Sequence, residues 1–260
     1  MARREADCAD FAEPLQRSVL CYEFVETATG VSVYAGSAWS ELFSATFDGA
    51  EPPRRARAEA DCAVVALLAS PFAPSLWAGD CEGTLSLYST ESMHRTASLR
   101  LMNSTLTALK TFDEQKLLVA ARDDLLKLVD VTSLVTLTSF AASEAAVTAC
   151  EAVARLGLCF SGHSTGTLRL LDPREPGAPR QVLKAHSHIV SQITFNSATE
   201  HQFASACYGG LIAIWDLRSD RALYEIDSAA QRKIYSLAWN GATRLLSAGE
   251  DDSIVAHRLN

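Results

Sequence analysis

The stretch Cys207-Tyr-Gly-Gly-Leu-Ile-Ala-Ile-Trp215-Asp216-Leu-Arg218 decides the fold of this chain. A Gly-Gly pair followed by a short apolar run predicts a tight turn and then a buried β-strand that ends in a Trp-Asp pair. Weaker copies of the same pattern occur on both sides of it, at residues 121–130, 163–172 and 249–257. The chain is therefore built from an internal repeat.

The spacing of this repeat identifies the architecture. The position of Trp215 recurs at Ala45, Tyr88, Val129, Leu171 and His257, so that successive spacings are 43, 41, 42, 44 and 42 residues. A period of about 40–45 residues with a terminal Trp-Asp pair is typical of the WD repeat, in which each repeat forms one four-stranded blade of a β-propeller. We therefore predict an all-β WD-repeat β-propeller with six blades, and an interaction scaffold rather than an enzyme.

Each repeat shows the same internal order of strands. The first, inner strand is rich in Val, Ile, Leu, Ala and aromatic residues, which predicts packing on both faces. The inner strands are expected at residues 18–24, 63–69, 106–112, 147–153, 189–195 and 234–239. Turns rich in Gly, Asp and Ser are expected between the second and third strands, at residues 81–83, 122–124, 164–166, 208–210 and 250–252.

The predicted domain organisation is a short segment, residues 1–17, followed by the propeller at residues 18–260. The last repeat stops after its third strand, at Asn260. We expect residues 8–16 to pair with the last sheet and close the ring, because this pairing would hide an exposed sheet edge.

Composition and charge limit the classes of function that the chain can have. The chain has 260 residues and a net charge of −8, which argues against a generic nucleic-acid binder. The basic run at residues 52–57 is interpreted as a solvated loop, with a localisation or RNA-contact element as the alternative. The seven cysteines form no CxxC pair and are expected to be reduced core residues. No signal peptide and no membrane span are evident, so a soluble intracellular protein is expected.

A set of polar residues in the fifth repeat fits the structural hydrogen bonds that WD repeats often use. His186, Ser205 and Trp215 occupy three positions of this set, and Gly209 stands where an Asp is usual. The structural repeat positions elsewhere in the chain are predicted to be Ser247 and Asp251, with His257 in place of Trp, and Asp123, Asp172 and Asp216.

A catalytic interpretation of these residues is the alternative. A Ser, a His and an Asp could form a hydrolytic triad, but their spacing follows the repeat and no nucleophile elbow is present. His186 and His188 alone make a poor metal site. The sequence contains no phosphate-binding loop. We therefore expect no catalytic, cofactor or metal site.

Four turn residues are candidate partner contacts: Trp39, Arg122, Tyr208 and Glu250. All four lie in turns between second and third strands, which line one face of a propeller. An exposed aromatic or Arg side chain there is a plausible anchor for a partner. The alternative is a partly buried turn residue with no contact role.

The C-terminal half goes beyond a generic WD repeat. It contains Leu-Arg-Leu-Leu-Asp-Pro-Arg at 168–174, Val-Leu-Lys-Ala-His-Ser-His-Ile-Val-Ser at 182–191, Ile-Trp-Asp-Leu-Arg-Ser at 214–219 with Ala-Leu-Tyr at 222–224, Ile-Tyr-Ser-Leu-Ala-Trp at 234–239 and Leu-Ser-Ala-Gly-Glu-Asp at 246–251. In order and spacing, these runs resemble the WD-repeat ribosome-biogenesis subunit of the PeBoW complex, the partner of the block-of-proliferation and pescadillo proteins. The resemblance covers residues 105–260.

This resemblance implies a non-catalytic scaffold for assembly of the large ribosomal subunit and maturation of its rRNA, in the nucleus, nucleolus and nucleoplasm. The implied partners are a block-of-proliferation-type propeller, on which the chain docks, a pescadillo-type protein and the pre-ribosomal particle. Neither sequence-specific nucleic-acid binding nor membrane binding is expected. Another WD-repeat adaptor, such as a cargo receptor or a ubiquitin-ligase substrate adaptor, is the alternative.

The sequence departs from this family in two respects. The family carries an N-terminal ubiquitin-like domain that engages a dynein-related ATPase, and its propeller usually has seven blades. Here at most 17 residues precede the first repeat, and six repeats are evident. These departures lead us to expect a reduced form that does not engage the ATPase.

Overall fold

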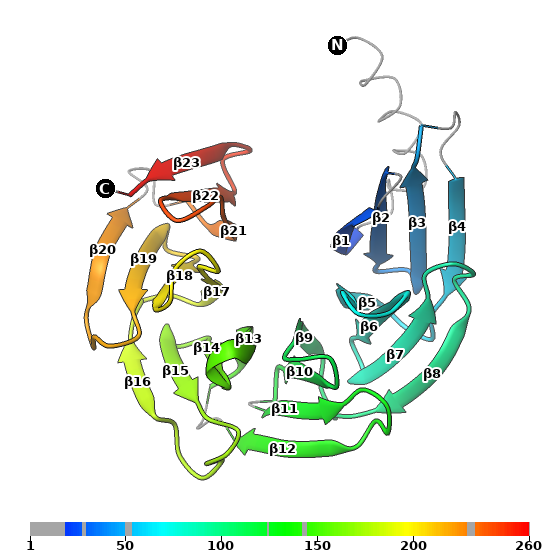
Figure 1. Ribbon diagram of the computed structural model, residues 1–260, viewed down its shortest axis with the longest axis horizontal. Coiled ribbons are helices and arrows are strands. Elements are labelled where there is room, and N and C mark those ends of the chain that lie inside the picture. Colours follow the sequence, from blue (N-terminus) through cyan, green and yellow to red (C-terminus); the bar gives the residue numbers. More distant parts are fainter. Residues whose placement is uncertain are drawn as a thin grey trace. The chain divides into compact units, whose positions relative to one another are not determined.

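The described part of the chain is all-β. The computed structural model describes residues 19–27, 30–49, 54–123, 125–141, 145–227 and 232–259, which form strands and one short 3-10 helix, η1 (Ala154–Leu156). The chain divides into two compact units, Met1–Leu109 and Lys110–Asn260. The strands form six antiparallel sheets (Figure 1), and in each sheet strands that follow one another in the chain are neighbours.

The first unit contains two complete four-stranded sheets. The first sheet consists of β1 (Val19–Thr27), β2 (Gly30–Ser37), β3 (Glu41–Phe47) and β4 (Arg54–Glu59). The second sheet consists of β5 (Val64–Ala69), β6 (Ser75–Asp80), β7 (Thr84–Ser89) and β8 (Arg95–Arg100).

The third sheet begins with β9 (Leu106–Thr111), which spans the division between the units, and continues with β10 (Lys116–Ala121), β11 (Leu125–Asp130) and β12 (Thr136–Ala141). The fourth sheet consists of β13 (Val147–Val153), β14 (Leu158–His163), β15 (Thr167–Leu171) and β16 (Gln181–Lys184). The fifth consists of β17 (Val190–Phe195), β18 (Gln202–Cys207), β19 (Leu211–Asp216) and β20 (Ala222–Asp227), and the sixth of β21 (Ile234–Trp239), β22 (Arg244–Gly249) and β23 (Ile254–Arg258).

The predicted fold class and repeat register are confirmed. Trp215 lies opposite Phe203 of the preceding strand, and the five other repeat positions lie opposite equivalent residues. Those pairs are Val33–Ala45, Leu76–Tyr88, Leu117–Val129, Cys159–Leu171 and Leu245–His257. The inner strands β5, β9, β13, β17 and β21 begin and end within one residue of the predicted bounds. The six sheets are thus the six blades of a WD-repeat β-propeller.

One packing unit recurs in every blade. A glycine or alanine on the second strand lies opposite a large aliphatic residue on the third strand. The six pairs are Gly36–Leu42, Gly79–Leu85, Ala120–Leu126, Gly162–Leu168, Ala206–Ile212 and Ala248–Ile254. In the first, second and fourth blades the small residue is a glycine, and a Cβ atom there would lie against the first strand of the next blade. A Cβ atom on Gly162 would lie 2.6 Å from Cγ1 of Val190, the first residue of β17.

Aromatic side chains fill the core between the fourth and fifth blades. The rings of Phe160 and Phe203 lie 4.6 Å apart, and the ring of Phe203 stacks on that of Trp215 at 6.0 Å. All three residues are buried in one cluster with Leu168, Leu183 and other apolar residues. Buried aromatic pairs contribute packing energy beyond the area that they bury, so this cluster stabilises the second unit.

The structure corrects the interpretation of the basic run. Residues 54–57 do not form a loop, because Arg54–Glu59 is β4, the outer strand of the first sheet. Arg57 pairs with Glu41 of the neighbouring strand, and Arg54 lies 3.4 Å from Asp48. Charged side chains on an outer strand keep it from pairing with other chains, which explains a basic sequence in a β-strand.

The first inner strand also differs from the prediction. β1 extends to Thr27 and is not packed on both faces, since Tyr22 and Phe24 are exposed while Cys21 and Val25 are half-buried. The expected closing strand at residues 8–16 lies outside the described residues. Of the seven cysteines, six are described and all six are free thiols, three of them buried, namely Cys150, Cys159 and Cys207.

The repeat register predicts different costs for two equivalent substitutions. Ile212 is 1% exposed, whereas Ile254, at the same register position in the last blade, is 77% exposed. Ile212→Ala should lower the free energy of unfolding by about 2–5 kcal/mol, because a buried aliphatic side chain leaves a cavity. Ile254→Ala should lower it by less than about 1 kcal/mol. Urea unfolding of both variants measures these costs, and equal costs would show that the register is wrong.

Candidate protein-interaction surface and the hydrogen bonds that support it

The predicted polar set of the fifth blade is assembled in the folded chain. His186 Nε2 lies 2.7 Å from Ser205 Oγ, and Trp215 Nε1 donates a 2.9 Å hydrogen bond to the same oxygen. All three side chains are buried, and Ser205 is fully buried. The Ser205 hydroxyl, on β18, is thus hydrogen-bonded both to the loop before β17 and to β19. Gly209 stands where WD repeats usually have an Asp, and it supplies no side chain to the set.

Burial fixes the charge of His186. Desolvation lowers its pKa from 6.5 to about 4, so the ring is neutral at physiological pH. Trp215 Nε1 donates to Ser205 Oγ, and the hydrogen bond between this hydroxyl and His186 Nε2 runs in the direction that the tautomer of the ring sets. Among the described residues Nδ1 has no hydrogen-bond partner. A buried polar group without a hydrogen-bond partner costs stability.

The fourth and sixth blades build related bonds from different residues. In the fourth blade His163 Nε2 lies 2.9 Å from Ser161 Oγ, and His163 Nδ1 lies 3.1 Å from the Ala145 carbonyl oxygen. In the sixth blade His257 Nε2 lies 2.8 Å from Ser247 Oγ, so the imidazole occupies the place of the indole. Sequence reasoning missed His163, although its place at the end of a second strand, two residues after a serine, could have indicated it.

Two of the predicted Asp residues do not join these sets. The Asp251 carboxylate accepts a 2.7 Å hydrogen bond from the Ser253 hydroxyl within the turn after β22, whereas His257 is bonded to Ser247. Asp123 is an exposed residue of the turn after β10. Both are turn residues, because the side chains that would need their carboxylates are absent from the sixth and third blades.

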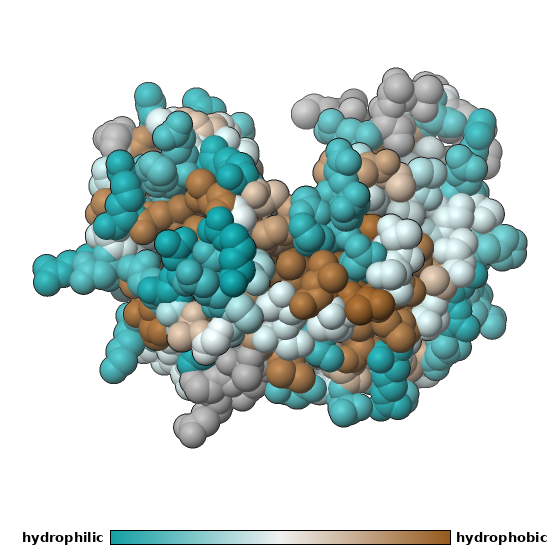
Figure 2. Space-filling view, turned by 60° about the horizontal axis from the view of Figure 1, so that its bottom comes forward, coloured by the Kyte–Doolittle hydropathy of each residue, from teal (hydrophilic) through white to brown (hydrophobic). Residues whose placement is uncertain are grey.

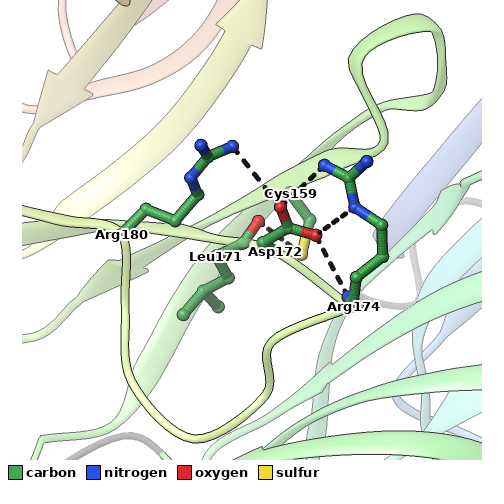
Figure 3. Close-up of polar contacts among 5 residues, drawn as sticks. All are labelled: Cys159, Leu171, Asp172, Arg174 and Arg180. Carbon is green, nitrogen blue, oxygen red and sulfur yellow. Dashed lines mark hydrogen bonds and ion pairs between the residues drawn. The ribbon is translucent and has the colours of Figure 1, made fainter.

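Asp172 and Asp216 fix the chain after two third strands. The Arg174 guanidinium donates to both Asp172 oxygens, at 2.8 and 2.7 Å, and Arg180 lies 3.4 Å away on the other side (Figure 3). Arg218 donates to Asp216 in the same two-bond geometry, at 2.8 and 2.6 Å. These side-chain hydrogen bonds lower the pKa of both carboxyl groups to about 2. In both repeats of the Asp-x-Arg sequence, the arginine side chain therefore stabilises the turn that follows the third strand.

These geometries favour structural roles. The Ser205 hydroxyl is fully buried and contacts both His186 and Trp215, so it is not presented to a substrate. No group of three His, Cys, Asp or Glu residues in the described ranges could hold a metal ion. No helix within these ranges is long and apolar enough to cross a membrane.

The four candidate contact residues lie in the predicted turns. Trp39, in the first unit, follows β2 and is 65% exposed. In the second unit, Arg122 is exposed after β10, and Tyr208 is partly exposed after β18. Glu250 lies in the turn after β22, with its carboxylate 3.4 Å from Lys233 Nζ.

Tyr208 belongs to an exposed aromatic pair that the sequence did not reveal. Its ring meets the ring of Tyr235, from β21, edge to face at 5.8 Å between centroids. Ile189, which precedes β17 and accepts a hydrogen bond from the Tyr208 amide, is also exposed. We call Ile189, Tyr208 and Tyr235 the tyrosine patch. Figure 2 shows that apolar residues also reach other parts of the visible surface, where they are interspersed with hydrophilic residues. Exposed aromatic residues of this kind anchor protein partners.

The repeat register and the buried His-Ser-Trp set define the class: this is a WD-repeat β-propeller protein. The family "WD domain, G-beta repeat" matches residues 177–216, which include this set.

Among characterised proteins, the chain is 32% identical to the ribosome biogenesis protein YTM1 of Meyerozyma guilliermondii, over 40% of this chain and 23% of that protein. It is 26% identical to YTM1 of Pyricularia oryzae, over 54% of this chain and 35% of the relative. It is 31% identical to the ribosome biogenesis protein WDR12 homolog of Trichoplax adhaerens, over 36% of this chain and 22% of that protein. The matched part thus spans about a quarter to a third of these relatives. The resemblance predicted from the sequence is confirmed.

Trp215 supports a direct test of the His-Ser-Trp set. Trp215→Ala should lower the free energy of unfolding on the order of 3–5 kcal/mol, because it removes a buried ring and a donor to Ser205. Trp215→Phe should cost less, since a ring still packs on Phe203. Chemical denaturation of both variants measures the difference, and a cost below about 1 kcal/mol for Trp215→Ala would contradict the burial.

The depressed pKa of His186 predicts a pH dependence of stability. Below pH 6.5 the unfolded chain takes up a proton at His186, whereas the folded chain resists protonation until about pH 4. Stability should therefore fall as the pH is lowered from 6.5 towards 4, with His186 contributing on the order of 1–2 kcal/mol by pH 5. Urea unfolding at pH 7 and pH 5 should show a smaller loss for His186→Gln than for the unaltered chain, and parallel losses would contradict the prediction.

Proposed function

We propose that this chain is a non-catalytic scaffold in the assembly of the large ribosomal subunit and the maturation of its rRNA. The observation that carries the proposal is the similarity of the chain to relatives that are named as ribosome biogenesis proteins. The buried, mutually bonded positions of His186, Ser205 and Trp215 support the non-catalytic part of the proposal, because the Ser205 hydroxyl does not face solvent.

The proposed mechanism is rigid display of side chains on short turns. The turn after β18 is held by backbone hydrogen bonds, because the Tyr208 amide donates to the Ile189 carbonyl at 3.0 Å and the Gly210 amide donates to the Cys207 carbonyl at 3.2 Å. A partner that binds preformed turns orders little new chain, so less binding free energy is lost as entropy. We propose the tyrosine patch as the anchor, with the Lys233–Glu250 pair beside it as a polar rim.

The proposed partners are a block-of-proliferation-type propeller, a pescadillo-type protein and the pre-ribosomal particle, in the nucleolus and nucleoplasm. A net charge of −8 supports protein contacts over RNA contacts, because phosphate binding requires clustered Lys and Arg side chains. Several arginines lie on the outer strand β4. Two of them, Arg54 and Arg57, already pair with acidic residues of the same unit.

A purification after nuclease treatment tests this proposal. The tagged chain should capture the propeller partner from its own cells after RNA has been digested, and depletion of the chain should cause large-subunit rRNA precursors to accumulate. Tyr208→Ala with Tyr235→Ala should weaken the capture about tenfold or more, because aromatic anchors carry much of an interface's energy. The matched control is Tyr224→Ala, an equally exposed tyrosine on the outer strand β20.

Three outcomes would contradict parts of this proposal. Loss of the propeller partner after nuclease treatment would show that RNA bridges the two proteins. Capture of ubiquitin-ligase or cargo-transport subunits without pre-ribosomal proteins would favour the adaptor alternative. Equal effects of the Tyr224 and Tyr208/Tyr235 substitutions would exclude the tyrosine patch as the anchor.

A further inference from the structure

We propose that β12, the outer strand of the third sheet, is a self-association site, at which β12 of a second copy of this chain adds in antiparallel orientation. This inference goes beyond the proposed function, because it does not depend on any ribosomal partner. It rests on the sequence and the exposure of β12 compared with the outer strands of the other blades.

β12 is the outermost strand of a complete four-stranded sheet (Figure 1). On its inner side it pairs with β11, from Leu125–Ala141 to Val129–Thr136. On its outer side no strand of the described ranges pairs with it. Alternate amide and carbonyl groups of an edge strand point away from the sheet, so such an edge can accept a strand from another chain.

β12 differs from the outer strands of the other four-stranded sheets in charge. Residues 131–141, Val-Thr-Ser-Leu-Val-Thr-Leu-Thr-Ser-Phe-Ala, include no charged residue. By contrast, β4 carries three arginines and one glutamate, β8 two arginines, β16 one lysine, and β20 one glutamate and one aspartate. Charged side chains on an outer strand hinder pairing with other chains. Among the outer strands of the five four-stranded sheets, β12 is therefore the one without this protection.

The exposed side chains along this segment favour strand pairing. Val135, which precedes β12, is 56% exposed, and Leu137 is 49% exposed. Thr136 and Thr138 are half-buried between them and Ser139. Threonine, valine and phenylalanine are residues that fit a pleated sheet, and the segment contains neither proline nor glycine. A segment of this composition on a sheet edge is prone to pair with its like.

A β-bulge in β12 hinders pairing but does not distinguish this strand from the others. Leu128 pairs with Thr138 and Val129 with Thr136, so Leu137 is the extra residue. The same irregularity occurs in β20, where the extra residue is Leu223, and Leu223 is 44% exposed. The two leucines match in register and in exposure. Since β20 also carries two acidic residues, Leu223 provides a control for the effect of charge.

A second copy of the chain fits this edge because β12 is compatible with itself. An antiparallel pair with a two-fold axis at Leu137 would place Leu137 opposite Leu137, Thr136 opposite Thr138 and Val135 opposite Ser139. Apolar pairs and threonine pairs across two strands are stabilising, whereas like charges are destabilising. Two-fold symmetric pairing is the commonest arrangement of protein dimers. The other four outer strands would each bring an equal net charge from both copies.

This self-association should be weak and should depend on salt. One pair of strands buries less surface than a standard protein interface. Each chain also carries a net charge of −8, so two copies repel at long range, and salt screens this repulsion. We therefore expect a dissociation constant between about 1 µM and 1 mM that falls as the salt concentration is raised.

Sedimentation equilibrium of the full chain tests the proposal. Leu137→Lys and Leu137→Glu should each raise the dissociation constant of the dimer at least about tenfold, because each places like charges opposite one another. An equal mixture of the two variants should associate again, since lysine then lies opposite glutamate. Leu223→Lys is the matched control and should leave the dissociation constant unchanged. Thermal unfolding should show that all three variants are folded.

Hydrogen exchange locates the contact. Amides of β12 should become protected as the concentration of the unaltered chain is raised, while those of β20 should not change. A chain that stays monomeric up to about 1 mM would overturn the proposal. A dimer that persists in Leu137→Lys, or one that Leu223→Lys weakens equally, would also overturn it. Failure of the mixed variants to associate would exclude antiparallel pairing centred at Leu137. Capture of a different protein through β12 by a monomeric chain would assign the edge to that protein instead.

Discussion

The structure depends on close packing of each blade against the next through a small residue and a large one. In five blades a glycine or alanine on the second strand lets the third-strand aliphatic residue reach the following blade or its own outer strand. Gly162 illustrates the constraint, because any side chain there would overlap Val190. Large apolar residues buried at this density provide most of the folding free energy, and polar groups must fit around them.

Hydrogen-bonded side chains are secondary to this packing and vary from blade to blade. The position of Ser205 holds serine in the last three blades, as Ser161, Ser205 and Ser247, and each of these hydroxyls meets an imidazole. In the first three blades the same position holds Ala35, Ala78 and Val119, all buried. At this position the first three blades therefore use apolar contact in place of a hydrogen bond. The His and Trp positions are interchangeable because any neutral ring nitrogen that reaches the hydroxyl satisfies it.

These features are consistent with the binding function that we propose. The buried polar groups support the fold, so the solvent-exposed residues lie mainly on turns and outer strands. Within the second unit, the tyrosine patch presents two aromatic rings packed edge to face. Aromatic side chains of this kind are common anchors in protein–protein interfaces.

The sequence by itself determined the class of fold, the number of blades and the register, because the period and the Trp-Asp ending repeat every 41 to 44 residues and each strand pairs with its neighbour in the chain. It also placed His186, Ser205 and Trp215 in one set. The tertiary structure decided that Arg54 to Arg57 form an outer strand, that His163 replaces a loop histidine, that Tyr208 meets Tyr235, and that Ile254 is exposed where five equivalents are buried. These features depend on which residues of different strands and blades lie side by side, and a repeat pattern read along one chain does not contain that information.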